Sequence, residues 1–402
     1  MTGTDITVSR RDFLAGTTLG IAGLWSGASA SLVGTLAKRG GMLLYVGTYT
    51  EGGRRDGIHF VRMNSRTGAL HAAGEADVGP NPSFLSIHPG GRTLYAVNEI
   101  TALNGRPTGT VRAFTIAGGT GRLTPLGATQ PTEGAAPCYL STDRAGHNLL
   151  VANYVSGTIA MLPIGTDGAL GAPITVVQHE GRGPTARQES PHAHCIVAHP
   201  AGRFVLAADL GIDRVLVYQL EAKAGTLRPL PAGDAVLPPG TGPRHLAFHP
   251  TLPLVFVSGE LASTVTALRV DAETGALAIA ETRSTLPDGW NGENFPADIH
   301  VAPSGHTLYV SNRGHNSIAV FSVAESTGAL ALEQVVSTGG DWPRNFTIDP
   351  TNRWLLVANQ RSNSITVFAR DLRSGRLAPT SQRLTLPSPA CLRFHDLRAM
   401  QG

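Results

Sequence analysis

A pattern of about fifty residues recurs along this chain of 402 residues. Each copy has an apolar segment, a turn of the type His-Pro-x-Gly-Arg, and a second apolar segment that ends in Asn or a substitute. The clearest copy begins at Phe84 and reads FLSIHPGGRTLYAVNE. The turn residues, used here as anchors, are Pro89, Arg144, Pro200, Pro250, Pro303 and Pro350, with a further match at Lys38. Anchors from Pro89 onward lie 47 to 56 residues apart, so the chain contains seven repeats.

Each repeat contains two more apolar segments after the anchor turn. A third alternating segment such as SIAVFSV is followed by a Thr-Gly or Ser-Gly turn and a fourth segment such as GALALEQVV. Four short strands in a unit of this length are typical of a β-propeller blade. No segment keeps a helical period of 3.6 residues, which excludes helical solenoids. The sequence therefore predicts an all-β fold, a seven-bladed β-propeller with four antiparallel strands per blade.

The two ends of the repeat region complement each other. The first repeat begins at its second strand, LLYVGTY from Leu43, and has no first strand of its own. The last segment, PACLRFHD from Pro389, matches a first strand with nothing after it. Pairing the two would close the ring and remove exposed strand edges. We therefore expect the C-terminal strand to join blade one.

The N-terminal residues are typical of an export signal rather than of the fold. The segment SRRDFL from Ser9 resembles the twin-arginine motif, and small residues then lead to a cleavage site after Ala30. The apolar run between them is too short to span a bilayer comfortably. We expect an export signal at 1–30, a linker at 31–40 and the propeller at 41–402. The twin-arginine machinery and signal peptidase would then be partners during export, and the mature protein would be periplasmic or secreted without a stable membrane span.

Composition narrows the range of partners. The net charge is +3 and only 15% of residues are charged, so the dense basic face of a nucleic-acid binder is absent. Cys138, Cys195 and Cys391 are too few for a disulfide framework, and we expect buried thiols. We also expect a monomer without a cofactor.

A site should stand out as a departure from the apolar consensus at one mouth of the ring. The mouth is the end of the ring's centre where the first strand of each blade begins and the second strand ends. Residues six and five before each anchor, and ten after it, should line it. The polar side chains expected there are His194, Arg244, His245, Glu260, Asp298, Arg313, Arg344 and Glu99, with His300 further in on the strand of Asp298.

Other histidines have simpler interpretations. His88, His199 and His249 each precede an anchor, so we interpret them as turn packing. His192 and His194 form His-x-His, a possible metal pair, but no clear cysteine or carboxylate ligand set accompanies them, and we predict no metal. Arg313 and Arg344 have an alternative interpretation as structural partners of Glu260 or Asp298.

Several of these segments resemble the seven-bladed lactonase family, which includes propeller-type 6-phosphogluconolactonases and fungal carboxymuconate-lactonizing enzymes. They are PHAHCIVAHPAGRFVLAADLGIDRV from Pro191, GPRHLAFHP from Gly242, ADIHVAPSGHTLYVSNRGHNSIAVF from Ala297 and PRNFTIDPTNRWLLVANQRSNSITVF from Pro343. The resemblance runs from about Gly41 to Asp396. It implies an active site of one His, two Arg and one Glu, which fall on His194, Arg244, Arg313 and Glu260. One departure is Gly259, where the family often has Asn before the glutamate.

Lactone hydrolysis needs an activated water, a stabilised oxyanion and a proton for the leaving alkoxide. Our hypothesis makes His194 the base, Glu260 its partner or the acid, and Arg244 and Arg313 the anion clamp. The remaining mouth residues would bind substrate: His192, His245, Asp298, His300, Arg344 and Glu99. The expected substrate is a small anionic sugar-acid lactone.

Two other functions fit the same residues. One is cycloisomerisation of a muconate, in which a carboxylate attacks a double bond that is protonated. The other is a propeller that binds a small anionic ligand without turnover, because propellers host many unrelated functions. Export also argues against a phosphorylated substrate, since phosphogluconolactone is made in the cytoplasm.

Overall fold

The computed structural model describes residues 41–50 and 56–395. The predicted export signal and linker lie outside the described residues, so their assignment remains a prediction. Among the described residues, no helix has the length and apolar character needed to cross a membrane.

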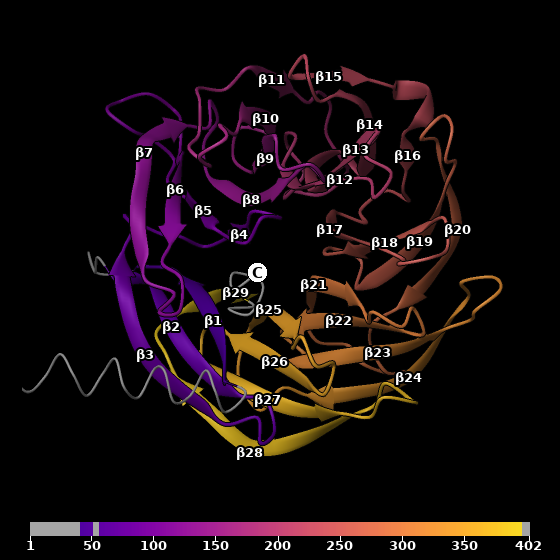
Figure 1. Cartoon of the computed structure of the whole chain (residues 1–402). Coiled ribbons are helices and arrows are strands. Elements are labelled where there is room, and N and C mark those ends of the chain that lie inside the picture. Colours follow the sequence, from indigo (N-terminus) through magenta and orange to yellow (C-terminus); the bar gives the residue numbers. More distant parts are fainter. Residues whose placement is uncertain (1–40, 51–55, 396–402) are drawn as a thin grey trace, which may run out of the picture.

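Seven four-stranded antiparallel units form a ring, with the first strand of each nearest the centre (Figure 1). The first three blades contain β29 (Pro389–His395), β1 (Gly41–Thr48), β2 (Asp56–Asn64) and β3 (Leu70–Asp77); β4 (Leu85–Ile87), β5 (Thr93–Asn98), β6 (Thr110–Ile116) and β7 (Leu123–Pro131); and β8 (Pro137–Thr142), β9 (Asn148–Asn153), β10 (Thr158–Pro163) and β11 (Thr175–Gln178). The fourth contains β12 (Ala193–Ala198), β13 (Phe204–Asp209), β14 (Arg214–Glu221) and β15 (Thr226–Pro229). The last three contain β17 (Pro243–Phe248), β18 (Leu254–Gly259), β19 (Thr264–Val270) and β20 (Leu277–Ser284); β21 (Phe295–Val301), β22 (Thr307–Arg313), β23 (Ser317–Val323) and β24 (Leu330–Ser337); and β25 (Pro343–Ile348), β26 (Trp354–Asn359), β27 (Ser364–Arg370) and β28 (Leu377–Thr385).

The predicted ring closure is confirmed. β29 pairs antiparallel with β1, for example Val46 with Leu392. The blade count and the strand count per blade are also as predicted. Blade four differs in one respect, because the short strand β16 (Ala235–Val236) pairs with β14 as a fifth strand. Two 3-10 turns, η2 (Leu210–Ile212) and η3 (Pro231–Gly233), also belong to this region.

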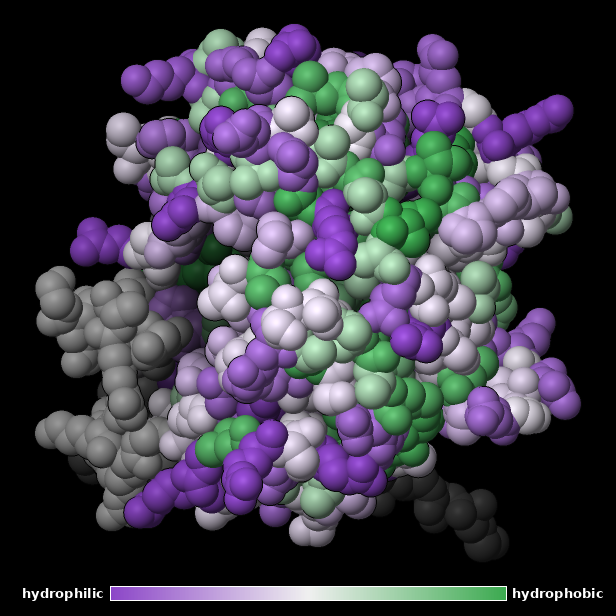
Figure 2. Space-filling view, turned by 90° about the vertical axis from the view of Figure 1, so that its right-hand side faces the viewer, coloured by the Kyte–Doolittle hydropathy of each residue, from purple (hydrophilic) through white to green (hydrophobic). Residues whose placement is uncertain are grey.

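The core lies between neighbouring blades. Second strands such as β5 and β9 are buried along their whole length, which is why they are almost continuously apolar. One core cluster joins Tyr309 of blade six to Phe346 of blade seven. Fourth strands such as β3 are mostly exposed, and the side of the ring mixes hydrophilic and hydrophobic residues (Figure 2).

The anchor turns confirm the interpretation of their histidines. Nδ1 of His88 accepts the N–H of Gly90 at 2.9 Å, and Nδ1 of His249 accepts the N–H of Leu252 at 2.8 Å. His199 caps its own turn in the same way. The three cysteines are buried free thiols, as expected.

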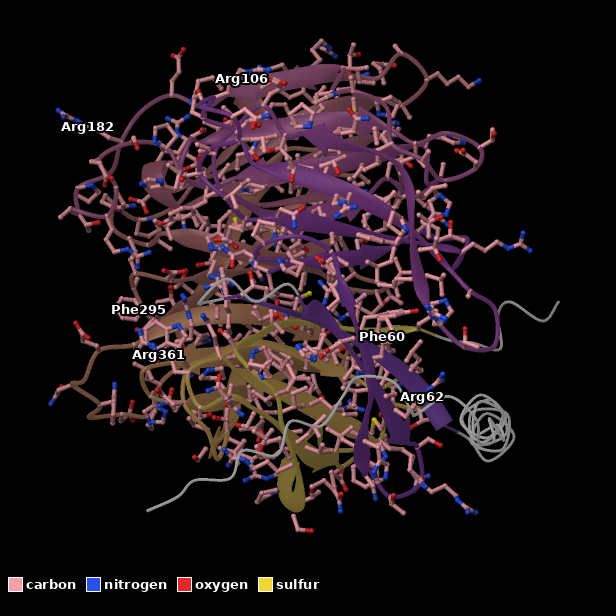
Figure 3. All side chains as sticks on the ribbon, turned by 90° about the vertical axis from the view of Figure 1, so that its left-hand side faces the viewer. Phe60, Arg62, Arg106, Arg182, Phe295 and Arg361 are labelled. Carbon is pink, nitrogen blue, oxygen red and sulfur yellow. The ribbon has the colours of Figure 1, made fainter. Side chains whose placement is uncertain are left out.

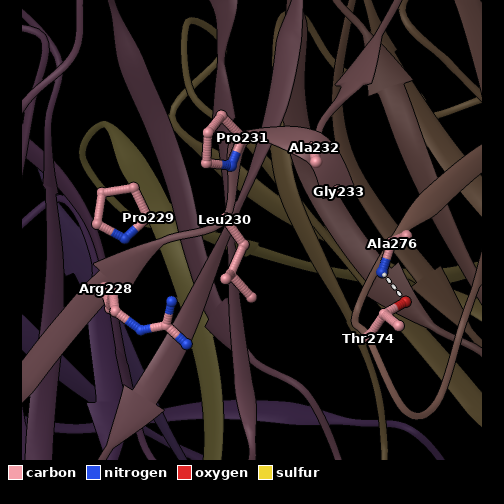
Figure 4. A pocket seen from close by; sticks show the side chains of 8 residues that line it. All are labelled: Arg228, Pro229, Leu230, Pro231, Ala232, Gly233, Thr274 and Ala276. Atoms are coloured by element: carbon pink, nitrogen blue, oxygen red, sulfur yellow. Dashed lines mark hydrogen bonds between the residues drawn. The ribbon is translucent and has the colours of Figure 1, made fainter.

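The outer edge holds a pocket of about 550 Å³ where β15 and η3 meet the turn before β20 (Figure 4). Its lining residues are Arg228, Pro229, Leu230, Pro231, Ala232, Gly233, Thr274 and Ala276. It contains none of the predicted site residues, which belong to the centre of the ring.

Candidate active site

The first strands of several blades carry a β-bulge near their start, where the predicted polar residues lie. The pairing of β12 with β13 shifts between Ala193 and Cys195, so His194 is left out of the ladder. The same shift occurs in β17 between Pro243 and Leu246 and in β25 between Pro343 and Asn345. Bulges commonly redirect a side chain next to an active site. Figure 3 shows Phe295, at the start of β21, and Arg361 toward one face of the ring, whereas Arg62 lies toward the other.

Glu260 is a buried carboxylate held by three guanidinium groups. Its Oε2 lies 2.9 Å from Nε of Arg244 and 2.6 Å from Nη2 of Arg313. Its Oε1 lies 2.8 Å from Nη2 of Arg187. Burial alone would raise the pKa of this carboxyl, but Arg313, Arg244 and Arg187 lower it to about 2. Glu260 is therefore ionised at any working pH and holds no proton to donate.

Arg244 also belongs to a second buried chain of hydrogen bonds. Its Nη1 donates to Nε2 of His245 at 3.0 Å, and Nδ1 of His245 donates to Oδ1 of Asp298 at 2.9 Å. His300 bonds the other oxygen of Asp298 at 3.0 Å. Burial, and then Arg244, lower the pKa of His245 to about 3, so this imidazole is neutral. Asp298 also accepts bonds from the Asn345 amide and the Phe346 N–H. Both oxygens of Asp298 thus accept hydrogen bonds from the protein itself.

His194 is buried beside this chain. Its Nδ1 lies 3.7 Å from Sγ of Cys138, and its ring packs edge-on against Tyr154 and His245, with centroids 5.4 and 5.3 Å away. Burial, and then the charge of Arg244, lower the pKa of His194 well below its usual value. The imidazole is therefore neutral and able to accept a proton. The expected pair of His194 with Glu260 does not occur among the contacts of the described residues, because Glu260 is directed at the arginines.

Blades seven, one and two contribute a second cluster of hydrogen-bonded polar side chains at the mouth. Arg344 donates to the Tyr49 hydroxyl at 2.7 Å, and that hydroxyl donates to Oε2 of Glu99 at 2.8 Å. The Ser83 hydroxyl donates to the same carboxylate oxygen. Burial raises the pKa of Tyr49, so it remains a neutral bridge between the two charges.

His192 belongs to neither of these clusters of hydrogen-bonded side chains. Its ring stacks on Tyr154 at 4.6 Å, and its Nδ1 bonds the Tyr154 carbonyl at 3.0 Å. Tyr154 in turn stands edge-on to His194, so it separates the two histidines of the His-x-His motif. Within the described ranges, no three His, Cys, Asp or Glu side chains are grouped to hold a metal ion.

Sequence reasoning missed several residues of the site. Arg187 comes from the segment between β11 and β12, outside the repeat register, and its partly exposed side chain reaches Glu260 and the Tyr154 hydroxyl. Trp342, just before β25, places its ring 5.3 Å from the Arg313 guanidinium. Two features of the sequence could have drawn attention to Arg187, its charge and the unusual length of that segment. Neither feature specifies which residue its side chain contacts.

The mouth carries more positive than negative charge. Four guanidiniums (Arg187, Arg244, Arg313 and Arg344) face three carboxylates (Glu99, Glu260 and Asp298). Nε of Arg244 and Nη2 of Arg313 are taken up by their ion pairs with Glu260, at 2.9 and 2.6 Å. The surplus of guanidinium charge favours binding of an anionic oxygen at this mouth.

The protein is thus a seven-bladed β-propeller with a buried neutral histidine and a surplus of guanidinium groups at one mouth. The family model for "Lactonase, 7-bladed beta-propeller" matches residues 43–394, and the chain belongs to this family. It is a hydrolase.

Known relatives cover nearly the whole fold. The 6-phosphogluconolactonase of Bacillus subtilis is 37% identical over 350 residues, which is 87% of this chain and 97% of that protein. The 6-phosphogluconolactonase of Formosa agariphila is 32% identical over 356 residues, covering 87% and 99%. The structure of the periplasmic gluconolactonase of Pseudomonas aeruginosa superposes with a TM-score of 0.83 at 34% identity, covering 89% and 99%.

Proposed function

We propose that this protein is an exported lactonase that hydrolyses a sugar-acid lactone at the mouth of the ring. The observation that carries this proposal is the neutral, buried His194 at a mouth that holds more guanidinium groups than carboxylates. Relatives with the names 6-phosphogluconolactonase and periplasmic gluconolactonase support the reaction class. The twin-arginine-like segment at Ser9 and the periplasmic relative support export.

The proposed mechanism uses His194 as base and then as acid. The neutral imidazole takes a proton from water, which attacks the lactone carbonyl, and Arg244 and Arg313 stabilise the oxyanion that forms. The imidazolium then gives its proton to the ring oxygen as the C–O bond breaks. Glu260 holds the two arginines in place, and Arg187 and Arg344 attract the carboxylate that forms on the product.

A panel of lactones tests this function. We expect hydrolysis of glucono-lactone and related aldonolactones, and slower hydrolysis of the 6-phosphorylated lactone, because an exported enzyme meets unphosphorylated sugars. A chelator should leave the rate unchanged, since the mechanism uses no metal. Preference for the phosphorylated lactone would contradict the proposed substrate, and no hydrolysis across the panel would contradict the lactonase function itself.

The pH dependence should reflect the lowered pKa of His194. A base must be unprotonated, so activity is lost as the pH falls through its pKa, and burial and Arg244 place that pKa well below 6.5. We expect kcat/KM to be nearly constant between pH 8 and pH 6, with the acid limb at lower pH. The measurement is kcat/KM against pH, corrected for spontaneous lactone hydrolysis. Half-maximal activity near pH 6.5 would show a solvated base instead.

A further inference from the structure

The backbone just before the first strand has the same conformation in most blades, and blade four differs from it. In five blades the residue eight before the anchor has a positive φ between 40° and 63° and is followed by proline; the pairs are Asn81–Pro82, Ala136–Pro137, Gly242–Pro243, Trp342–Pro343 and Ser388–Pro389. Blade six keeps the proline, Pro296. Blade four has His192 without a positive φ, followed by Ala193. This is the blade whose bulge carries His194, and it lacks the fixed φ that proline supplies.

Blade four also differs from most other blades in the residue at the end of its second strand. Four blades have asparagine there. In three of them its amide donates to a carbonyl of the segment leading into the first strand, for example Asn153 to Thr132 at 3.1 Å and Asn312 to Thr285 at 2.8 Å. Blade four has Asp209 instead, which cannot donate. The position of Thr132 is taken by His179, as shown by the equivalent backbone bonds of the two residues to Gly109 and Gly157.

Asp209 and His179 form a fully buried pair. Nδ1 of His179 lies 2.6 Å from Oδ2 of Asp209, and both side chains have no exposed surface. Nε2 of His179 lies 3.0 Å from the Tyr218 hydroxyl. With Nδ1–H donated to Asp209, Nε2 accepts the hydroxyl proton of Tyr218. The three residues therefore fix the orientation of the Asp209 carboxylate.

The other oxygen of Asp209 holds the backbone that leads to His194. Oδ1 accepts the N–H of His192 at 2.7 Å and the N–H of Gly211 at 2.9 Å. The carbonyl of His192 accepts the N–H of Leu210 at 3.0 Å. Asp209 also pairs with Ala193 in the ladder, immediately before the bulge. Both polar groups of the His192 backbone are thus tied to Asp209 and its neighbour.

We propose that Asp209, oriented by His179 and Tyr218, is a positioning residue that sets the place of His194 at the mouth. This inference rests on the proposed role of His194 as the base. Where five other blades use a proline and a left-handed residue, blade four uses two charge-assisted hydrogen bonds from backbone to carboxylate. A displacement of a base by about 1 Å can cost on the order of a hundredfold in rate.

The repeat itself supplies the test. Asp209→Asn installs the residue of the other blades, and the double variant His179→Thr with Asp209→Asn installs the full pair of blade three. We expect kcat for lactone hydrolysis to fall by about ten- to a hundredfold, with KM within about threefold, while the protein remains folded. Asn359→Ala, at the same repeat position in blade seven, is the control and should keep kcat within about twofold even if it lowers the unfolding temperature as much.

A second measurement separates this inference from the function. In protein labelled at histidine, the NMR signals of the His194 ring, identified by their loss in His194→Ala, should move in the Asp209 variants and stay in Asn359→Ala. If the wild-type protein hydrolyses no lactone, the function fails, and the NMR signals still decide the role of Asp209. Unchanged His194 signals in the Asp209 variants, or an equal loss of kcat in Asn359→Ala, would overturn the inference.

Discussion

Replacing His194 by alanine is expected to lower kcat for lactone hydrolysis by at least about a hundredfold. In the proposed mechanism the neutral imidazole is the proton acceptor, and alanine can neither take the proton from water nor return it to the leaving oxygen. Binding of a sugar acid should change little, because the guanidinium groups that attract the anion are untouched. The measurements are steady-state kinetics and the Kd of the aldonate product.

His199→Ala is the matched control for this prediction. His199 lies just beyond the opposite end of β12, where it caps an anchor turn, so its loss should leave kcat within about twofold. If His194→Ala kept more than a tenth of the wild-type kcat, another group would have to be the base. If binding of the product were lost together with turnover, His194 would be a ligand contact rather than a base.

The fold was predictable because each of its features recurs. Seven copies of one pattern define seven blades, and the unmatched strands at Leu43 and Pro389 define how the ring closes. The additional strand β16 was not predictable, since it occurs in one blade only. The bulges were also missed, because a bulge is a slip in pairing and leaves no mark on an apolar alternation read one strand at a time.

The location of the candidate site could be predicted from the sequence, but the contacts between its side chains could be predicted only in part. The start of the first strand and the end of the second strand correctly placed Glu260, Arg244 and Arg313 together. The partner of each charge depends on side-chain geometry across blades, so Glu260 was expected beside His194 and is instead held by arginines. His245 and Asp298, which were expected to bind substrate, also bind each other, and His245 accepts a hydrogen bond from Arg244.

The clearest consequence of that pairing concerns stability. Glu260→Gln keeps the shape of the side chain but removes the charge that compensates Arg244 and Arg313, whose side chains are almost completely buried. Breaking a buried ion pair from one side typically costs about 3 to 5 kcal/mol in the free energy of unfolding. We expect a loss of that size in chemical denaturation at pH 7, together with a fall in kcat, because the arginines lose their fixed position.

The exposed pair of Arg106 and Glu133 provides the comparison. It has a similar separation, 3.0 Å, but exposed side chains, so Glu133→Gln should cost less than about 1 kcal/mol.

The cost of Glu260→Gln should also depend on pH. The folded-state pKa of Glu260 is lowered from 4.5 to about 2, so its contribution is complete above pH 4.5 and is lost as the pH falls toward 2. The difference in stability between the wild type and Glu260→Gln should therefore be constant from pH 7 to pH 5 and narrow below pH 4.5. A difference no larger than that of Glu133→Gln would show that the guanidiniums do not depend on this carboxylate.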